Sequence, residues 1–349
     1  MARRIKHLIM LRRILVIVFV ICLPMVLISC GNNSTPVETS LFALDTYITM
    51  TSYGSGSEKA LEQASNTITY FEKLWSVTDE SSEIYRINHA NGEPISISDE
   101  TFNIIDFSLD ISKKTNHALD ITLYPILTAW GFTTDDYNIP SDTQIKTLLT
   151  HTGVDKVRLE NSSITLDKGT NIDLGAVGKG YIGDKVIETL KDNGIQSALL
   201  NLGGNVQTLG SKPDGSSWSI GIRNPFDEGN FATIEVVDKA VITSGGYERY
   251  FVGQDNNVYW HILDGKTGKP AKSGLISATI VGNEGKLCDA LSTATFVMGL
   301  DKSIDFWKEY HNFDMILVTE NSEIYITNGI ESSFSLNQEF YNMKVNVIN

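Results

Sequence analysis

The chain has 349 residues, of which 42% are apolar and 20% are charged, and its formal net charge is −14. This composition is typical of a globular protein with enough apolar side chains for a core, and the acidic balance excludes nucleic acid, whose phosphates would be repelled. Residues 1–29 carry five basic and no acidic side chains, so the remaining body has a net charge of −19. Such a body needs a local cation to bind a polyanionic ligand, which points to a metal ion.

The first thirty residues have the features of a bacterial targeting segment. A basic start is followed by an apolar run at 14–28, and its length of about 15 residues is below the ~20 that a membrane-spanning helix needs. The run ends in Leu-Ile-Ser-Cys-Gly, the pattern of a lipobox, which predicts cleavage before Cys30 and a lipid such as palmitate on its sulfur. An uncleaved anchor helix is the alternative. We therefore expect a lipoprotein signal peptide at 1–29, a lipidated cysteine and tether at 30–40, and attachment to the extracytoplasmic face of the cell membrane.

Apolar spacing predicts the elements of the body, which we expect to be one folded domain at 41–349. A strand at 41–51 comes first, and helices follow at 57–75, from Ser98 onward and at 141–149, with a hairpin at 156–166. From residue 171 the pattern changes to a glycine-rich turn, a helix at 180–193, and strands at 197–202, 217–222, 232–237, 248–252 and 258–262. Helices at 286–298 and 303–310 precede a closing hairpin at 313–319 and 322–327. Runs of strands separated from runs of helices favour an α+β fold over a doubly wound one.

Two glycine-rich stretches lie beside predicted strands. Residues 173–184 hold four glycines, three of them within the six residues 175–180 that lead into a predicted helix, together with Lys179. A helix N-terminus with a nearby lysine favours phosphate, although the spacing fits neither a Walker loop nor a dinucleotide fingerprint. The stretch Asn-Leu-Gly-Gly-Asn at 201–205 similarly allows backbone to approach a ligand. Plain turns are the alternative in both places.

A carboxylate and a hydroxyl are placed together on the predicted helix at 286–298. Asp289 and Thr293 are four residues apart, so their oxygens share one helix face. Together with waters and ligand phosphates, these oxygens suit Mg²⁺, a hard cation that usually keeps few protein ligands. The alternative is an ordinary solvated helix face.

Three further stretches combine polar and aromatic side chains. His261 and Asp264 are three apart at a strand end, where a histidine could act as a general base or play a structural role. Residues 243–250 mix hydroxyls, glycines and an arginine, and a bulged turn would explain them equally well. Trp130 and Phe132 are expected in the core, with a place beside an aromatic ligand as the alternative.

Taken in order, these stretches resemble the ApbE family of FAD:protein FMN transferases over nearly the whole body. The matching motifs lie at 82–88 (Ser-Glu-Ile-x-Arg-x-Asn), 119–132, 173–180, 201–205, 243–249, 261–268 and 288–293. Two positions depart from the family pattern. Leu44 stands where the family has the Met of Met-Gly-Thr, and Thr78 stands where an aromatic residue often precedes the first motif.

The resemblance implies an ApbE-like body with mainly antiparallel sheets, flanking helices and an FAD cleft between two subdomains. It also implies single roles. Mg²⁺ would be bound by the side chains of Asp289 and Thr293 and the backbone carbonyl of Ala176, and His261 would be the general base. The FAD site would be lined by Ala118, Leu119, Asp120, Asp173, Lys179 and Ile262.

The function implied is Mg²⁺-dependent transfer of FMN from FAD to a Ser or Thr hydroxyl of an exported or membrane flavoprotein, with release of AMP. Acceptors would be proteins with FMN-binding domains, such as subunits of ion-pumping electron-transfer complexes. Two alternatives stay open. With water as the nucleophile, the same site would make a Mg²⁺-dependent FAD pyrophosphatase. A lipoprotein that binds flavin without chemistry is the other, and it would need neither His261 nor the Asp289 and Thr293 pair.

Overall fold

A computed structural model describes residues 35–349 apart from residue 135. The predicted signal peptide, the lipobox and Cys30 lie outside the described residues. Within the described part of the chain, no helix has the length and apolar character needed to cross a membrane.

The centre of the fold, among the described residues, is one sheet of nine strands. In spatial order these are β1 (Pro36–Ala43), β2 (Thr46–Tyr53), β6 (Ser197–Leu202), β7 (Asn205–Leu209), β10 (Ala240–Gly245), β15 (Leu275–Gly282), β16 (Asp314–Thr319), β17 (Ile324–Thr327) and β19 (Val345–Ile348). Neighbours are antiparallel except β17 and β19, which are parallel. The prediction of an α+β fold with mainly antiparallel sheets is confirmed.

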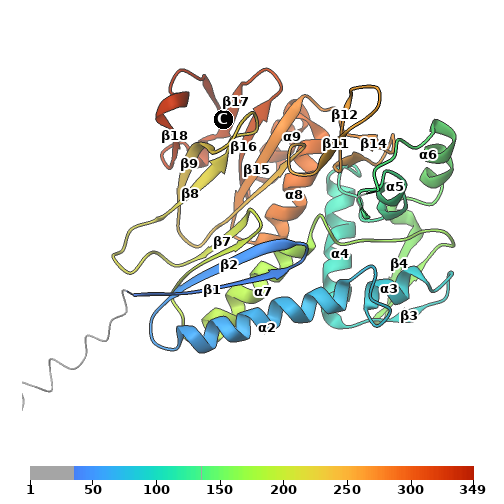
Figure 1. Ribbon diagram of the computed structural model, residues 1–349, viewed down its shortest axis with the longest axis horizontal. Coiled ribbons are helices and arrows are strands. Elements are labelled where there is room, and N and C mark those ends of the chain that lie inside the picture. Colours follow the sequence, from blue (N-terminus) through green and yellow to red (C-terminus); the bar gives the residue numbers. More distant parts are fainter. Residues whose placement is uncertain (1–34, 135) are drawn as a thin grey trace, which may run out of the picture.

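Helices cover one face of this sheet (Figure 1). They are α2 (Ser57–Trp75), α4 (Asp99–Lys114), α7 (Gly178–Asp192), α8 (Gly285–Met298) and α9 (Leu300–Tyr310). Their apolar stripes bury residues such as Ile68, Ile104 and Val186 in one main core, which also contains the sheet residues Leu200 and Ile280. Each such side chain contributes about 1.5–3 kcal/mol by leaving water.

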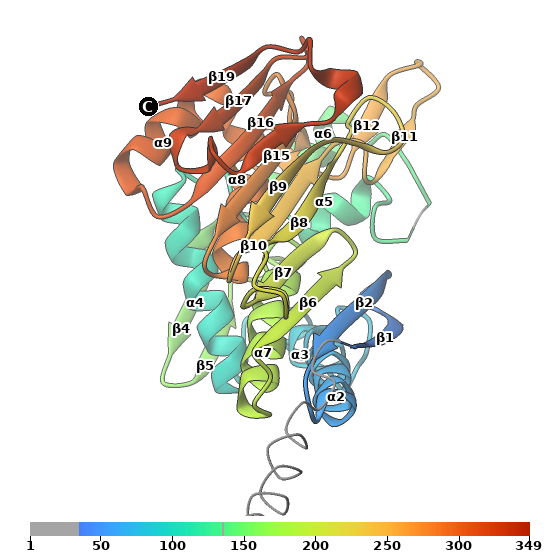
Figure 2. The ribbon, with the colours of Figure 1, turned by 90° about the vertical axis from the view of Figure 1, so that its left-hand side faces the viewer.

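A small sheet packs on the opposite face of the nine-stranded sheet (Figure 2). It consists of β8 (Trp218–Arg223), β9 (Asn230–Val236) and β18 (Phe334–Leu336). Ile220 and Ile234 of this sheet share a second core with Val241, Val281 and Ile316 of the large sheet. The central strands of the large sheet are therefore buried on both faces, by the helices on one side and by the small sheet on the other.

The remaining elements lie beside the helix layer, at the right of Figure 1. They are α3 (Glu83–Asn88), α5 (Tyr124–Ala129), α6 (Asp142–Leu149), β3 (Ile95–Ser96), β4 (Val157–Glu160), β5 (Ser163–Leu166), β11 (Tyr250–Val252), β12 (Val258–Trp260), β13 (Leu263–Asp264), β14 (Lys269–Pro270) and the 3₁₀ turn Val154–Lys156. Two further 3₁₀ turns, Asn328–Ile330 and Gln338–Phe340, lie instead near the C-terminus, against β16 and β9. Trp130 and Phe132, each 2% exposed, form a third core with Leu263, and Trp130 Nε1 donates to Gly268 O at 2.9 Å. The expectation that these aromatic residues are core is confirmed.

Several predicted boundaries are wrong for identifiable reasons. The single strand expected at 41–51 is the β1–β2 hairpin, whose turn residues Leu44 and Asp45 have φ of 55° and 56°. A type I′ turn needs two such left-handed residues and usually takes Asn or Gly, so this turn has a weak sequence signal. β7, β10 and β15 were not predicted, because strands buried on both faces lose the alternation that identifies a strand. Finally, α7 begins at Gly178, two residues before the expected start.

Candidate functional site

Helices α7 and α8 meet closely near the start of α7. A Cβ on Gly180 would lie 2.2 Å from the carbonyl oxygen of Gly285 and 2.6 Å from Cβ of Asp289, so only glycine permits this approach. The amide of Gly180 donates to Asp289 Oδ2 at 2.8 Å, and its carbonyl accepts from Gln207 Nε2 at 3.0 Å. The glycines that were expected to admit a ligand therefore also allow two helix backbones to pack together.

Asp289 and Thr293 of α8 lie at this junction. Asp289 is 6% exposed, and burial raises the pKa of its carboxyl group, while the Lys179 ammonium and the Gly180 amide oppose that rise. The hydroxyl of Thr293 lies 3.2 Å from Ser244 Oγ at the end of β10. A buried carboxylate, two hydroxyls and a lysine are thus gathered where α7 begins.

Lys179 lies near both this group and His261, because its positive charge lowers the pKa of both Asp289 and His261. His261 directly follows β12, and its Nδ1 lies 3.1 Å from the carbonyl oxygen of Arg249. A carbonyl only accepts, so Nδ1 carries the proton and the Nε2 lone pair is left available. Burial and the positive charges of Lys179 and Arg249 together lower the pKa of His261 to about 4, against the opposing effect of the hydrogen bond to Arg249 O. The imidazole is therefore neutral at pH 7.

Asp120 and Asp173 form a second polar group, joined by a hydrogen bond from the Asp173 amide to Ile121 O at 3.0 Å. Asp173 Oδ1 accepts from the Gly175 amide at 2.8 Å, and Asp120 Oδ1 accepts from the Thr122 amide and hydroxyl at 2.8 and 2.6 Å. Burial raises the pKa of Asp120; burial and the nearby Asp120 charge raise the pKa of Asp173 to about 6. Two such carboxyl groups suit the N–H donors of a heterocycle better than a phosphate.

The segment containing His261 also reaches the second group. A Cβ on Gly265 would lie 3.7 Å from Asp120 Oδ2. Gly265 follows His261 by only four residues. The segment 261–265 therefore places the His261 imidazole near Lys179 and the backbone of Gly265 beside Asp120. The structure therefore brings together stretches of sequence that begin at residues 118, 173, 261 and 288.

Four of the expected site residues can contribute mainly through their backbone. Ala118, Leu119 and Ile262 are 9%, 1% and 5% exposed, and their side chains belong to the main core. Ala176 lies in the turn directly before α7 and packs partly against the same core. The ligand-binding roles that the family resemblance implies for these four residues could therefore be filled only by their main-chain atoms.

Sequence reasoning assigned no role to Ser244 or Gln207. The hydroxyl of Ser244 lies 2.8 Å from Ser292 Oγ in addition to its contact with Thr293, and Gln207 fixes the first turn of α7. Ser244 falls within a family-like motif, which was the one available signal. Gln207 carried none, because its role depends on strand order.

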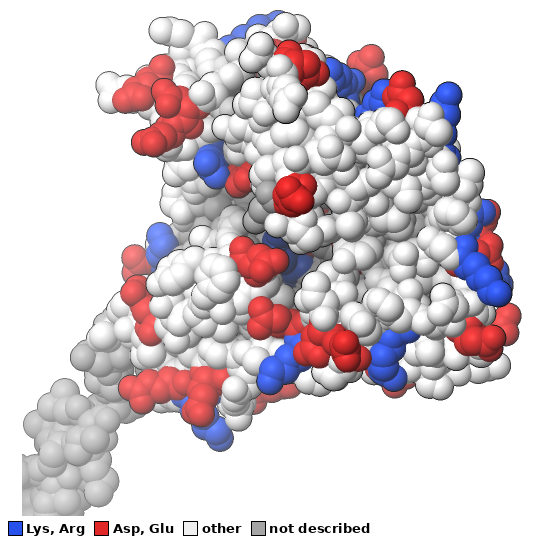
Figure 3. All heavy atoms as spheres, turned by 45° about the vertical axis from the view of Figure 1, so that its right-hand side comes forward, with Lys and Arg blue, Asp and Glu red and all other residues white. Residues whose placement is uncertain are grey.

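The surface is hollowed on the face shown in Figure 3, with a basic side chain inside the hollow and acidic side chains around it. Within the described residues, no group of three or more His, Cys, Asp or Glu side chains could hold a metal ion. A metal at the junction of α7 and α8 would therefore depend on hydroxyl, carbonyl and ligand oxygens besides Asp289. That donor set suits a hard cation such as Mg²⁺ and not a soft one.

The fold and the site together define a class of protein. It is an α+β protein in which a lysine, a buried carboxylate and hydroxyl oxygens meet at a helix N-terminus beside a neutral histidine. The ApbE family model matches residues 44–317, and the chain belongs to the ApbE family. The family resemblance read from the motifs is confirmed.

Known relatives agree with this membership. The FAD:protein FMN transferase of Klebsiella pneumoniae (strain 342) is 30% identical over 287 residues, which cover 80% of this chain and 89% of the relative. That of Treponema pallidum (strain Nichols) is 28% identical over 290 residues, covering 78% and 80%. Among solved structures, the ApbE protein from Thermotoga maritima has a TM-score of 0.81 at 31% identity, covering 86% of this chain and 99% of the other. Flavin transferase ApbE from Vibrio cholerae has a TM-score of 0.77 at 22% identity, covering 86% and 100%.

Proposed function

We propose that this chain is a Mg²⁺-dependent FAD:protein FMN transferase. The observation that carries the proposal is the meeting of Lys179, Asp289 and Thr293 at the start of α7, in a body whose net charge is otherwise strongly negative. Relatives that carry this activity in their names add support. The products would be AMP and an acceptor protein with FMN on a Ser or Thr hydroxyl.

The metal would be held by the Asp289 carboxylate, the Thr293 hydroxyl and the Ala176 carbonyl. All three donors are oxygens, as Mg²⁺ prefers, and the hydrogen bond from Gly180 to Asp289 Oδ2 orients the carboxylate. When bound, Mg²⁺ neutralises charge on the pyrophosphate and on the departing phosphate. Lys179 and the N-terminal end of α7 would add to that stabilisation.

His261 would accept the proton of the attacking hydroxyl at Nε2. The hydroxyl oxygen would form a bond to the phosphorus on the riboflavin side, while the bond from that phosphorus to the bridging oxygen breaks and AMP leaves. The pKa of about 4 makes free His261 a weak base. Pairing of Lys179 with the anionic pyrophosphate would offset the repulsion that lowers this pKa, so substrate binding would strengthen the base.

The hydrogen-bonding groups at the other end of the site favour ring recognition. Asp120 and Asp173, with backbone groups of Ala118, Leu119 and Ile262, would accept hydrogen bonds from a ring of FAD. The acceptor-rich end and the cation-rich end would thus hold different parts of one dinucleotide. The cleft between them would be the FAD cleft expected from the resemblance.

Location and acceptor follow from the sequence and remain part of the proposal. A lipid on Cys30 would hold the domain at 41–349 on the extracytoplasmic face of the membrane. Acceptors would be exported or membrane flavoproteins with FMN-binding domains, such as subunits of ion-pumping electron-transfer complexes. Pyrophosphatase activity is the second candidate, because the attacking nucleophile is supplied from outside the chain.

The metal step can be tested with Asp289→Asn. The amide can still accept from the Gly180 amide, so folding should be retained while the negative charge is lost. We expect FAD cleavage, followed by AMP release, to fall to background in this variant, and wild-type protein with excess EDTA to behave in the same way. Full AMP release in EDTA would rule out the metal-dependent mechanism.

A further inference from the structure

Asn205, the first residue of β7, has a buried carboxamide with no hydrogen-bond partner. The residue is 2% exposed, and neither Nδ2 nor Oδ1 has a partner among the described residues. A buried polar group left unpaired costs about 1–3 kcal/mol, and native proteins rarely keep one without a reason. An apolar residue of similar size would avoid that cost, so the position of this amide requires an explanation.

The carboxamide points to the helix side of the sheet. Side chains of a strand alternate between faces, so Asn205 and Gln207 share a face. Gln207 Nε2 reaches Gly180 O in α7, which identifies that face as the helix side. Strand β6 agrees, because the residue paired with Asn205 is Leu202, whose side chain belongs to the main core beneath the helices.

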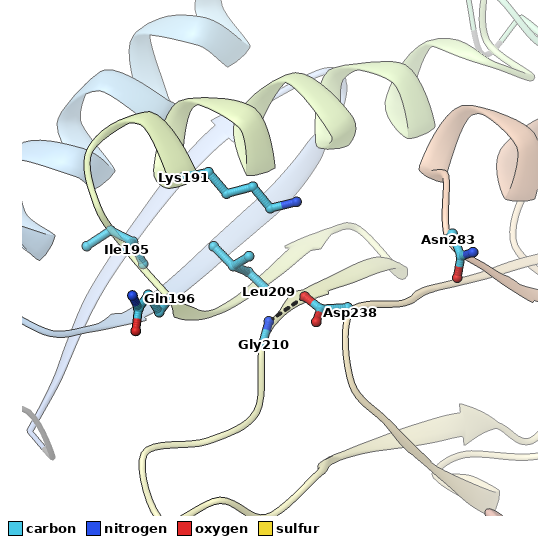
Figure 4. A pocket seen from close by; sticks show the side chains of 7 residues that line it. All are labelled: Lys191, Ile195, Gln196, Leu209, Gly210, Asp238 and Asn283. Carbon is cyan, nitrogen blue, oxygen red and sulfur yellow. Dashed lines mark hydrogen bonds between the residues drawn. The ribbon is translucent and has the colours of Figure 1, made fainter.

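The position of Asn205 along the axis of α7 follows from two other contacts between β7 and this helix. At the far end, Leu209 lines a cavity of about 570 Å³ together with Lys191 at the end of α7 (Figure 4). One step back, Gln207 lies against Gly183, where an added Cβ would meet its Nε2 at 2.1 Å. Residue numbers therefore rise in the same direction along β7 and α7, so the strand and the helix run parallel.

The next step along β7 leads to the start of α7. Two strand residues span roughly 6.6 Å, which equals about four residues of helix. Asn205 is accordingly level with the turn before α7 and its first residue, Gly178. That is also the level at which the Gly180 amide meets Asp289.

We propose that Asn205 is a substrate-binding residue of this site, whose Nδ2 donates to a phosphate oxygen of the dinucleotide bound at the start of α7. Oδ1 is left for a hydroxyl or a metal-bound water of the same ligand. The inference rests on the proposed function for the identity of the ligand. It adds a neutral donor from the sheet, beneath the site, to the charged groups that the two helices supply.

The test compares two substitutions that each remove an unpaired buried polar group. Asn205→Leu keeps the side-chain size and removes the amide. The control is Ser197→Ala in β6, because Ser197 Oγ is also buried without a partner but lies at the other end of its strand. Full-length protein in detergent is titrated with FAD and with riboflavin, which lacks the phosphates, and binding is followed by flavin fluorescence. Thermal unfolding is recorded without ligand.

We expect Asn205→Leu to weaken FAD binding roughly 10- to 100-fold, to leave riboflavin binding unchanged, and to unfold at the wild-type temperature or above. Ser197→Ala should bind both ligands as the wild type does. If Asn205→Leu does not fold, Asn205→Asp, which places a negative charge beside the phosphate, should lose FAD affinity at least as strongly. Wild-type affinity for FAD in the folded variants would overturn the role of Asn205 alone. Failure of the wild type to bind FAD would overturn the proposed function and this inference together.

Discussion

Gly180→Ala should destabilise the protein, although alanine is the better helix former. At an exposed helix position the change from Gly to Ala gains about 0.5–1 kcal/mol. At Gly180 the new Cβ would lie 2.2 Å from Gly285 O and 2.6 Å from Asp289 Cβ, neither of which can rotate away. Overpacking of this kind costs about 1–3 kcal/mol, and loss of the hydrogen bond to the Asp289 carboxylate costs about 1.5–3 kcal/mol more. The net loss of unfolding free energy should be roughly 2–5 kcal/mol.

Gly178→Ala is the matched control for this experiment. It lies in the same helix turn, and its added Cβ would meet Leu174 Cβ at 3.7 Å and Trp75 Cε3 at 3.9 Å, which are ordinary contacts. Urea unfolding of both variants gives the stability, and FMN transfer by Gly180→Ala reports whether Asp289 has moved. We expect stability near or above that of the wild type for Gly178→Ala, with loss of stability and transfer for Gly180→Ala. Equal stability of the two variants, with transfer retained, would refute the proposed packing of α7 on α8.

Three further predictions concern the base, the acidic pair and the anchor. His261→Ala should lower the single-turnover rate of FMN transfer on the order of 10²–10⁴-fold with little change in FAD affinity, and pH–rate curves of equal shape and height for mutant and wild type would exclude it as the base. The pKa of Asp173 is raised from 3.8 to about 6, so the stability that this group contributes is full below pH 3.8 and is lost as the pH rises through 6. The change in unfolding free energy caused by Asp173→Asn should therefore be about 1–2 kcal/mol more favourable at pH 8 than at pH 4, a figure that is reduced because Asp173 is partly exposed. The same change in unfolding free energy at both pH values would contradict this prediction. Cys30→Ala should leave an unlipidated precursor or released protein, and unchanged membrane retention with lipid label intact would argue against the anchor.

The residues of the site that were visible in the sequence are those whose roles depend on local spacing. Asp289 and Thr293 were found together because four residues are one helical turn, and Lys179 because it precedes a helix. The fold class could be predicted from the order of strands and helices. The spacing to Asp264 made His261 a candidate base, and the family resemblance added Asp120 and Asp173, whose proximity in space no local pattern reveals.

What the sequence did not reveal depends on contacts between distant segments. Ser244 and Asn205 reach the site because β7 and β10 are neighbours in the sheet, and both strands lack the alternation that would have identified them. Gly180 was expected to make room for a ligand, but its closest neighbour is the backbone of α8, 105 residues further along the chain. The hairpin turn at Leu44 was missed because its left-handed backbone is formed without glycine or asparagine.

The most direct test of the proposed transferase activity is to incubate the protein with FAD, Mg²⁺ and an exported protein that has an FMN-binding domain, and to measure flavin fluorescence on the acceptor in a denaturing gel. We predict a fluorescent acceptor band, release of one AMP for each FMN attached to the acceptor, and no fluorescent band when the acceptor hydroxyl is removed. Free FMN and AMP with an unlabelled acceptor would indicate a pyrophosphatase instead, and unchanged FAD would contradict both catalytic functions.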